Sequence, residues 1–185
     1  PAHFVVEHLP GAGPLRDGLT LGLAGIGEDE PPVLIVPGFM GPGFLLWPLA
    51  AFLRAHGRKV EILNTFPALG GVEDLAQRVA QAVDRLLAQS GASRVDYVAH
   101  SMGGLAARYY IRHLGGKAKV RRLVTIATPH GGTAWAQLRV TRSARDMMPG
   151  GDFLLALGDE ERLDGIRCTN IRAGWDQMVW PRQSG

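Results

Sequence analysis

Ser101 lies where a strand is predicted to end and a helix to begin. Residues 95–108 read VDYVAHSMGGLAAR, so the serine has small neighbours at Ala99, Gly103 and Gly104. A tight strand-to-helix turn requires small neighbours, and Ala99 takes the place of the first glycine of the G-x-S-x-G pattern. Backbone N–H groups at the helix start could stabilise an oxyanion beside the hydroxyl. The spacing predicts a nucleophilic serine; the alternative is a serine that only caps the helix.

The elements around Ser101 alternate between strand and helix. Short apolar runs predict strands over 33–36, 59–63, 94–99, 123–127 and 166–173. Apolar residues at helical spacing predict helices over 45–55, 72–89 and 101–114. This order indicates βαβ units with helices on both faces of the sheet. The predicted fold is a three-layer α/β fold with a mostly parallel central sheet.

The length of 185 residues allows one domain with a substantial core and is too short for two. Residues 1–32, rich in glycine and proline, are predicted to form an N-terminal arm or edge strands. Residues 131–164 contain only short apolar pieces, which is typical of a lid or an insertion. The expected organisation is a single domain over 1–185.

Composition argues against several classes of function. The formal charge is only +3 and the basic residues are dispersed, apart from the run at 117–122, which we expect to be a solvated loop. Nucleic acid is therefore not an expected partner. Cys168 is the only cysteine, so no intrachain disulfide is expected. No apolar run approaches the roughly 18 residues of a membrane span, and no signal pattern is visible, which favours a cytoplasmic location.

Three motifs give the chain a resemblance to a known family. AHSMGGLAARYY at 99–110, IATPHGG at 126–132 and VPGF at 36–39 resemble the bacterial lipases and esterases of the α/β-hydrolase superfamily, over about residues 33 to 181. The resemblance implies an α/β-hydrolase fold and cleavage of carboxylic esters through an acyl-enzyme. It also implies lipid or acyl ester substrates, contact with lipid surfaces, and no metal or organic cofactor. The oligomeric state stays open.

The resemblance assigns the oxyanion hole to two backbone N–H groups. Family members follow their first central strand with a tripeptide such as H-G-F, and the residue after the glycine donates its N–H. Phe39 matches that position, with Pro37 in place of the histidine. Met102, next to the nucleophile, would supply the second donor.

The resemblance also identifies an acid. Residues 176–184 read DQMVWPRQS and are similar to the family's acid loop, D-x-x-V-x-P-x-x-S. Asp176 would accept a hydrogen bond from an imidazole and fix its tautomer; the alternative is an aspartate in a surface turn. Four further aspartates, expected to be solvated charges, lie in the lid segment at Asp146, Asp152, Asp159 and Asp164.

The general base is the one member of the expected catalytic triad that the sequence does not identify. The histidines are His3, His8, His56, His100, His113 and His130. None of them follows Asp176, where the family places its base. His130, just beyond a predicted strand, is the nearest contender. We expect this chain to stop before the final strand and its histidine, and to be weakly active or inactive without it.

An apolar set is predicted to line an acyl site: Phe44, Leu45, Trp47, Met147 and Phe153. Plain core packing is the alternative for these side chains. Two rival functions also stay open. One is another serine acyl-transfer enzyme, such as a thioesterase, acyltransferase or amidase. The other is a non-catalytic hydrolase-like protein that binds its partner.

Overall fold

The computed structural model of the chain describes residues 4–8, 30–38, 41, 43–66, 70–134, 136, 141–158, 163 and 165–173. These residues form a six-stranded sheet with the strand order β1-β6-β5-β4-β2-β3. The strands are β1 Phe4–His8, β2 Val33–Val36, β3 Val60–Ile62, β4 Val95–His100, β5 Val120–Ile126 and β6 Arg167–Ala173. All neighbouring strands pair in parallel except β1, which pairs antiparallel with β6. The predicted, mostly parallel sheet is confirmed.

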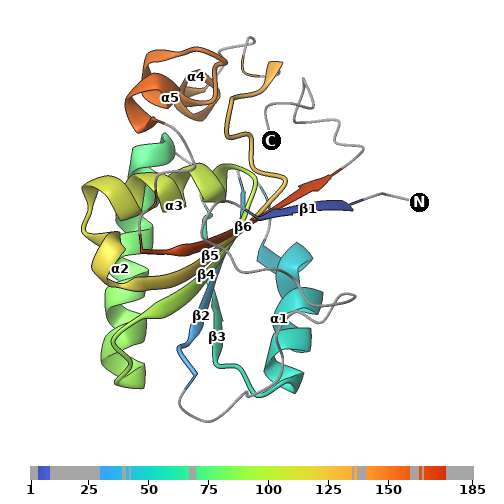
Figure 1. Cartoon of the computed structure of the whole chain (residues 1–185), viewed down its shortest axis with the longest axis vertical. Helices are drawn as coiled ribbons and strands as arrows, with labels where there is room; N and C mark the ends of the chain where they lie inside the picture. Colours follow the sequence, from blue (N-terminus) through green and yellow to red (C-terminus); the bar gives the residue numbers. More distant parts are fainter. Residues whose placement is uncertain are drawn as a thin grey trace.

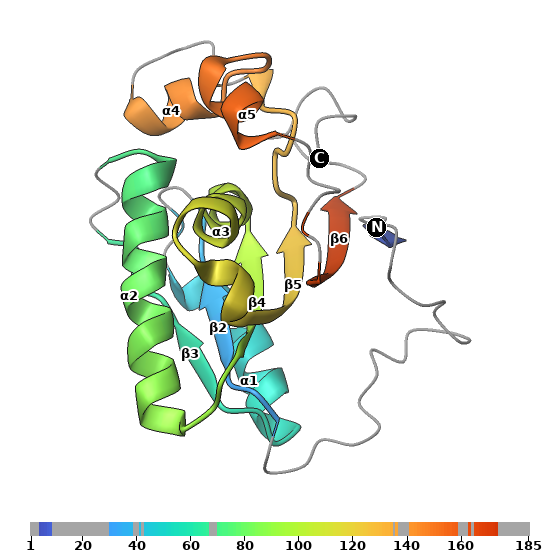
Figure 2. The ribbon, with the colours of Figure 1, turned by 60° about the vertical axis from the view of Figure 1, so that its left-hand side comes forward.

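Helices cover both faces of the sheet (Figure 1). The main helices are α1 Trp47–Ala55, which follows the 3-10 turn η1 Gly43–Leu46, α2 Val72–Ser90 and α3 Met102–His113. A second 3-10 turn, η2 Gly116–Ala118, leads into β5. Two short helices, α4 Arg142–Asp146 and α5 Asp152–Leu157, lie beyond the ends toward which the parallel strands point (Figure 2). The three layers agree with the predicted fold class.

Strand β2 shows why this sequence forms a central strand. Its side chains alternate between two buried clusters: Val33 and Ile35 pack with Ala50 of α1, whereas Leu34 and Val36 join the core beneath α2 and α3. A strand covered on both faces must be apolar at every position, which explains the continuous run.

Among the described helices, none is long and apolar enough to cross a bilayer.

The expectation of a solvated loop over 117–122 is wrong for the arginines. Strand β5 begins at Val120, three residues before the predicted start. Arg121 donates from Nε to Asp96 Oδ1 over 2.8 Å and also pairs with Glu30. Arg58 donates to Asp96 Oδ2 over 2.6 Å. The buried carboxylate of Asp96 therefore draws a basic residue into the sheet, a long-range effect that local patterning does not reveal.

Because of Asp96, the free energy of unfolding is expected to depend on pH in the acidic range. Burial by itself would raise the pKa of Asp96, but the hydrogen bonds and charges of Arg121 and Arg58 outweigh it and lower the pKa below its usual value. Because this folded-state pKa is depressed, the stabilisation is complete above about pH 4 and is lost as the pH falls through the folded pKa. Asp96→Asn should lower the free energy of unfolding near neutral pH by about 3 kcal/mol and flatten this acid dependence, as measured by urea unfolding.

A surface ion pair provides the control for this measurement. Asp84 pairs with Lys119 over 2.6 Å, but both side chains are well exposed. Asp84→Asn should therefore change the unfolding free energy by less than about 1 kcal/mol. Equal effects of the two substitutions would contradict a stabilising role for the buried Asp96 cluster.

Candidate active site

Ser101 occupies a strained backbone position between β4 and α3. Its φ of 53° and ψ of −128° lie where side chains are rarely tolerated. Of the described non-glycine residues, only Ser101 and Ala127 have a positive φ. Hydrogen bonds hold the turn: the Ser101 N–H donates to Ile126 O over 2.9 Å, and the Gly104 N–H donates to Ser101 O over 3.0 Å. Such a conformation costs on the order of 1–3 kcal/mol and is typical of functional sites.

The Ser101 side chain does not act as a helix cap. Ser101 is at the N-cap position of α3 but makes no side-chain capping hydrogen bond, and its backbone is not in the extended region usual for caps. The residue is half-buried, so one part of its surface reaches solvent. The structure therefore favours the nucleophile interpretation over the capping alternative.

Three glycines let the chain close around Ser101. A Cβ added to Gly38 would lie 2.6 Å from Ser101 Cβ and 3.1 Å from Ser101 Oγ. At Gly103 it would meet Val36 O at 2.7 Å, and at Gly104 it would overlap the side chain of Thr128. The glycines of SMGG thus pack α3 against β2 and against the segment after β5, while Gly38 brings the segment after β2 to the hydroxyl.

A recess of about 280 Å³, partly open to solvent, borders this turn. Its lining consists of Gly38, Thr65, Gly70, Gly71, Leu75, Arg78 and Met102. The guanidinium of Arg78, the single charged group in that lining, donates to the carbonyl oxygens of Thr65 and Asn64. Met102, the residue after Ser101, is buried. Phe39 and Asp176 lie outside the described residues.

The structure separates the residues predicted for an acyl site into two groups. Phe44, Leu45 and Trp47 are more than half exposed at the start of α1, where Phe44 and Trp47 meet edge to face with ring centroids 6.4 Å apart. Met147 and Phe153 pack against the core instead, and the Phe153 ring stacks on Tyr109 of α3 at 5.9 Å. The first group is thus largely exposed, whereas the second is partly buried.

Asp146 is not the solvated charge that was expected. Its Oδ2 accepts a hydrogen bond of 2.7 Å from the Val72 N–H at the start of α2, and burial raises the pKa of Asp146. The adjacent Ser143 hydroxyl donates to Gly70 O over 2.5 Å. These bonds fasten α4 onto the beginning of α2, next to the recess. Asp152 is exposed in the first turn of α5, and Asp159 and Asp164 lie outside the described residues.

His130 is partly buried, and its surroundings keep its ring neutral. Burial, together with the charges of Arg108 and Arg172, lowers the pKa of His130 to about 3. Its Nδ1 lies 3.3 Å from Nη1 of Arg108, and its Nε2 lies 3.3 Å from Oγ1 of Thr125. With both ring nitrogens held by protein groups, His130 does not have the freedom that a general base needs.

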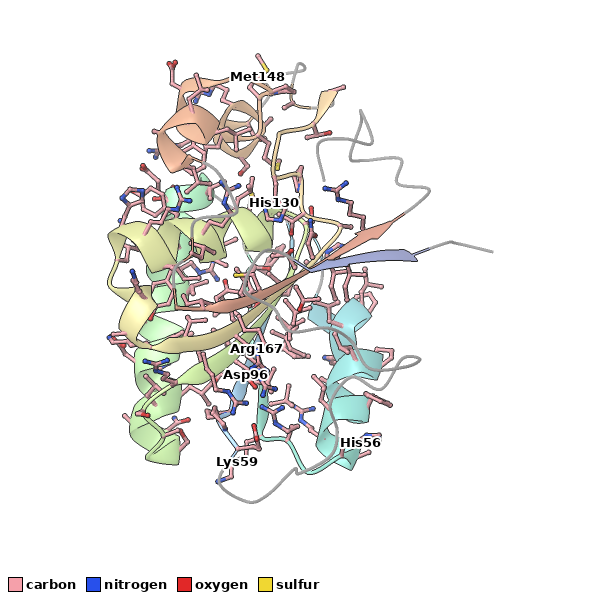
Figure 3. All side chains as sticks on the ribbon, viewed as in Figure 1. His56, Lys59, Asp96, His130, Met148 and Arg167 are labelled. Atoms are coloured by element: carbon pink, nitrogen blue, oxygen red, sulfur yellow. The ribbon has the colours of Figure 1, made fainter. Side chains whose placement is uncertain are left out.

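Two other histidines lie far from the turn. His56 follows the last turn of α1, where its Nδ1 is 2.8 Å from Phe52 O; Figure 3 shows it near the bottom of the view, well below His130. His113 is the last residue of α3, and its ring lies tilted against that of Tyr109, with centroids 4.7 Å apart. His100 directly precedes Ser101. The described part of the chain thus places no free imidazole in front of Ser101 Oγ.

Sequence reasoning missed Arg108 and Asn170. Arg108 is 2% exposed, and Asn170 is equally buried on β6. A signal for Arg108 was present, because it interrupts the apolar face formed by Leu105, Ala106 and Ile111. A charged residue on the core-facing side of a helix implies a buried partner. No comparable local signal marked Asn170.

Comparisons with known proteins agree with this geometry. The sequence profile described as palmitoyl protein thioesterase matches residues 57–155. Triacylglycerol lipases of Pseudarthrobacter phenanthrenivorans and Burkholderia plantarii are each 30% identical over 113 residues, which covers 57% of this chain. These matches cover 35% and 31% of the two lipases, so the chain spans about a third of the length of the curated relatives that it matches.

A solved structure extends the similarity to most of the chain. A Bacillus licheniformis lipase in its mature form superposes with a TM-score of 0.65 at 16% identity, covering 90% of this chain and 69% of that one. At this identity, the similarity shows the fold. The α/β-hydrolase fold implied by the sequence motifs is confirmed.

Proposed function

We propose that this chain, which belongs to the family described as palmitoyl protein thioesterase, is a hydrolase that cleaves carboxylic esters of lipids or other acyl compounds through Ser101. The strained turn at Ser101 carries the proposal. The backbone of Ser101 is strained although its side chain makes no capping hydrogen bond, and Gly38 is packed closely against Ser101. A purely structural residue at this position would be glycine.

In the proposed reaction, Ser101 Oγ attacks the carbonyl carbon of the ester while a base takes its proton. The N–H groups of Phe39 and Met102 donate to the oxyanion of the tetrahedral intermediate. The intermediate collapses, the C–O bond to the alcohol breaks, and the proton passes to the leaving oxygen. Water then attacks the acyl-enzyme and releases the acid. Asp176 would orient the base.

We propose that the base is a histidine other than the four whose side chains the structure describes. His130 is neutral and held at both nitrogens, and His56 and His113 lie at the far ends of α1 and α3. Chemical modification of Ser101 by a reactive probe requires less activation than ester turnover, so it tests the serine independently of the base.

The test is covalent labelling with a fluorophosphonate probe, followed by peptide mass spectrometry. The hydroxyl attacks the phosphorus atom and fluoride leaves, so the adduct stays on the nucleophile. We expect one adduct, on Ser101, and none on heat-unfolded protein or on Ser101→Ala. A probe that labels another serine, or labels folded and unfolded protein equally, would overturn the proposal and favour a non-catalytic binding protein.

Thioester hydrolysis is a second candidate, favoured by the family match over residues 57–155. The same acyl-enzyme forms from both substrate classes, so a matched pair with one acyl group separates them. p-Nitrophenyl butyrate and S-butyryl-N-acetylcysteamine differ only in the leaving group. A kcat/KM for the thioester at or above that for the ester would make thioesters the substrate class; acyl transfer to an added alcohol or amine would indicate an acyltransferase.

The exposed aromatic residues before and within α1 support lipid substrates. Phe44, Leu45 and Trp47 present an apolar surface to solvent, and no acidic residue occurs between Pro31 and Val60. Aromatic side chains of this kind favour the boundary between water and lipid. We therefore include contact with lipid surfaces in the proposed function.

A further inference from the structure

We propose that His130 is a positioning residue: its neutral ring connects the helix that follows Ser101 to strands β5 and β6 through a hydrogen-bond chain with one fixed direction. The inference rests on the proposed function, because the elements that it connects matter most if Ser101 is the nucleophile. It also gives the histidine of TPHGG a role other than general base.

The direction of the chain follows from the chemistry of its first member. An arginine can only donate, so Nη1 of Arg108, 3.3 Å from His130 Nδ1, requires Nδ1 to be an acceptor without a proton. The proton of the neutral ring therefore lies on Nε2 and is donated to Thr125 Oγ1, 3.3 Å away. The Thr125 hydroxyl in turn donates to Asn170 Oδ1 over 3.0 Å.

This hydrogen-bond chain joins the elements that carry the proposed site. Arg108 lies on α3 two turns after Ser101, Thr125 on β5, and Asn170 on β6, the strand that precedes the expected acid Asp176. The Ser101 N–H is itself bonded to Ile126 O of β5. A shift of β5 relative to α3 would therefore move the nucleophile relative to the acid.

The same guanidinium also fastens α5 over the site. Arg108 donates from Nη2 to Gly158 O, and Arg112 donates to Leu157 O, so two cations of α3 meet the carbonyl end of α5. Nη1 of Arg108 additionally lies 3.5 Å from the carbonyl oxygen of His130. Loss of the His130 ring would thus release Arg108 from one partner and loosen α5 as well.

The surroundings of His130 oppose its protonation. Among the described residues, the charged groups beside the ring are Arg108 from α3 and Arg172 from β6, and a small recess next to the ring is also lined by Cys168. A proton added at Nδ1 would point at the guanidinium of Arg108. At the far end of this hydrogen-bond chain, the buried Asn170 Nδ2 has no hydrogen-bond partner among the described residues, so the hydrogen-bond chain ends on a donor beside that recess.

The tautomer can be tested without any enzymatic assay. Protein with ¹⁵N-labelled histidine would be titrated by NMR from pH 5 to 8, with His130→Gln used to assign the resonances. We expect His130 to keep the shifts of a neutral ring with its proton on Nε2 over the whole range. Titration of His130 in this range, or a proton on Nδ1, would overturn the proposed chain.

The positioning role is tested by kinetics of two variants. His130→Leu removes both hydrogen bonds, and His130→Gln can retain a donor and an acceptor. We expect His130→Leu to lower kcat, or the rate of fluorophosphonate labelling, by about tenfold to a hundredfold with KM nearly unchanged. His130→Gln should recover most of this loss, and the pH profile should keep its shape in both.

Two outcomes would overturn the positioning role. If His130 were the base, both variants would lose activity equally and the pH profile would lose its acidic limb. If the role were only structural, both would lose thermal stability with unchanged kcat per folded molecule. If NMR shows the expected tautomer of His130 but the probe does not label Ser101, the proposed function is overturned while the hydrogen-bond chain stands. Failure of the inference and failure of the proposed function are therefore distinguishable.

Discussion

Ser101→Ala is expected to lower kcat/KM for p-nitrophenyl butyrate by at least about a thousandfold relative to the unmodified protein. The proposed acyl-enzyme cannot form without the hydroxyl, and only substrate binding and the oxyanion donors would remain. Initial rates at 400 nm, corrected for spontaneous hydrolysis, measure the effect. Residual activity above a few per cent would contradict a nucleophilic Ser101.

Two further variants make this result specific. Ser93→Ala removes an exposed serine just before β4 and should leave the rate unchanged. Ser101→Gly should be as inactive as Ser101→Ala but more stable by about 1 kcal/mol, because glycine relieves the positive φ whereas alanine does not. A higher melting temperature for the inactive glycine variant would show that stability has been given up for catalysis at this turn.

Gly38→Ala is expected to lower kcat by about a hundredfold or more while the protein stays folded. The added methyl group would lie 2.6 Å from Ser101 Cβ and 3.1 Å from the backbone oxygen of His100, so the segment after β2 must move away from the nucleophile. The proposed donor at Phe39 would move with it, and loss of one oxyanion donor costs about 100- to 1000-fold. Kinetics and circular dichroism, compared at equal folded fraction, measure the effect.

A second glycine in the same segment provides the matched control. A methyl group at Gly41 would have its closest contact at 3.4 Å, with Gly38 O, which is an ordinary van der Waals distance. Gly41→Ala should therefore retain most of the activity. Equal losses in both variants would indicate that any substitution in this segment is harmful, and would remove the argument that Gly38 and Ser101 must be in close contact.

Much of the fold could be predicted because its signals are local. Burial of β2 on two faces requires four consecutive apolar residues, and the amphipathic face of α2 requires apolar residues at helical spacing. The start of β5 could not be predicted in this way. Its basic residues look solvated until Asp96 and Glu30, remote in the sequence, are placed beside Arg121.

The candidate site divides in the same manner. The turn at Ser101 could be predicted because the small residues it needs are its immediate neighbours. The roles of Asp146 and His130 could not, because each depends on contacts with another element: Val72 at the start of α2 for the first, and Arg108 and Thr125 for the second. Whether an aspartate is solvated or hydrogen-bonded, and whether a histidine is charged or neutral, depends on such contacts.

By itself, the sequence determined the order of strands and helices, the family and the position of the strained serine, since all three depend on residue types at short spacing. The tertiary structure alone decided which apolar residues are core and which are exposed, and which polar groups are paired. It packs Phe153 on Tyr109 and leaves Trp47 open, and it buries His130 between two cations. A local pattern can indicate that a residue is buried, but the partners that bury or pair it come from distant segments, so only the tertiary structure identifies them.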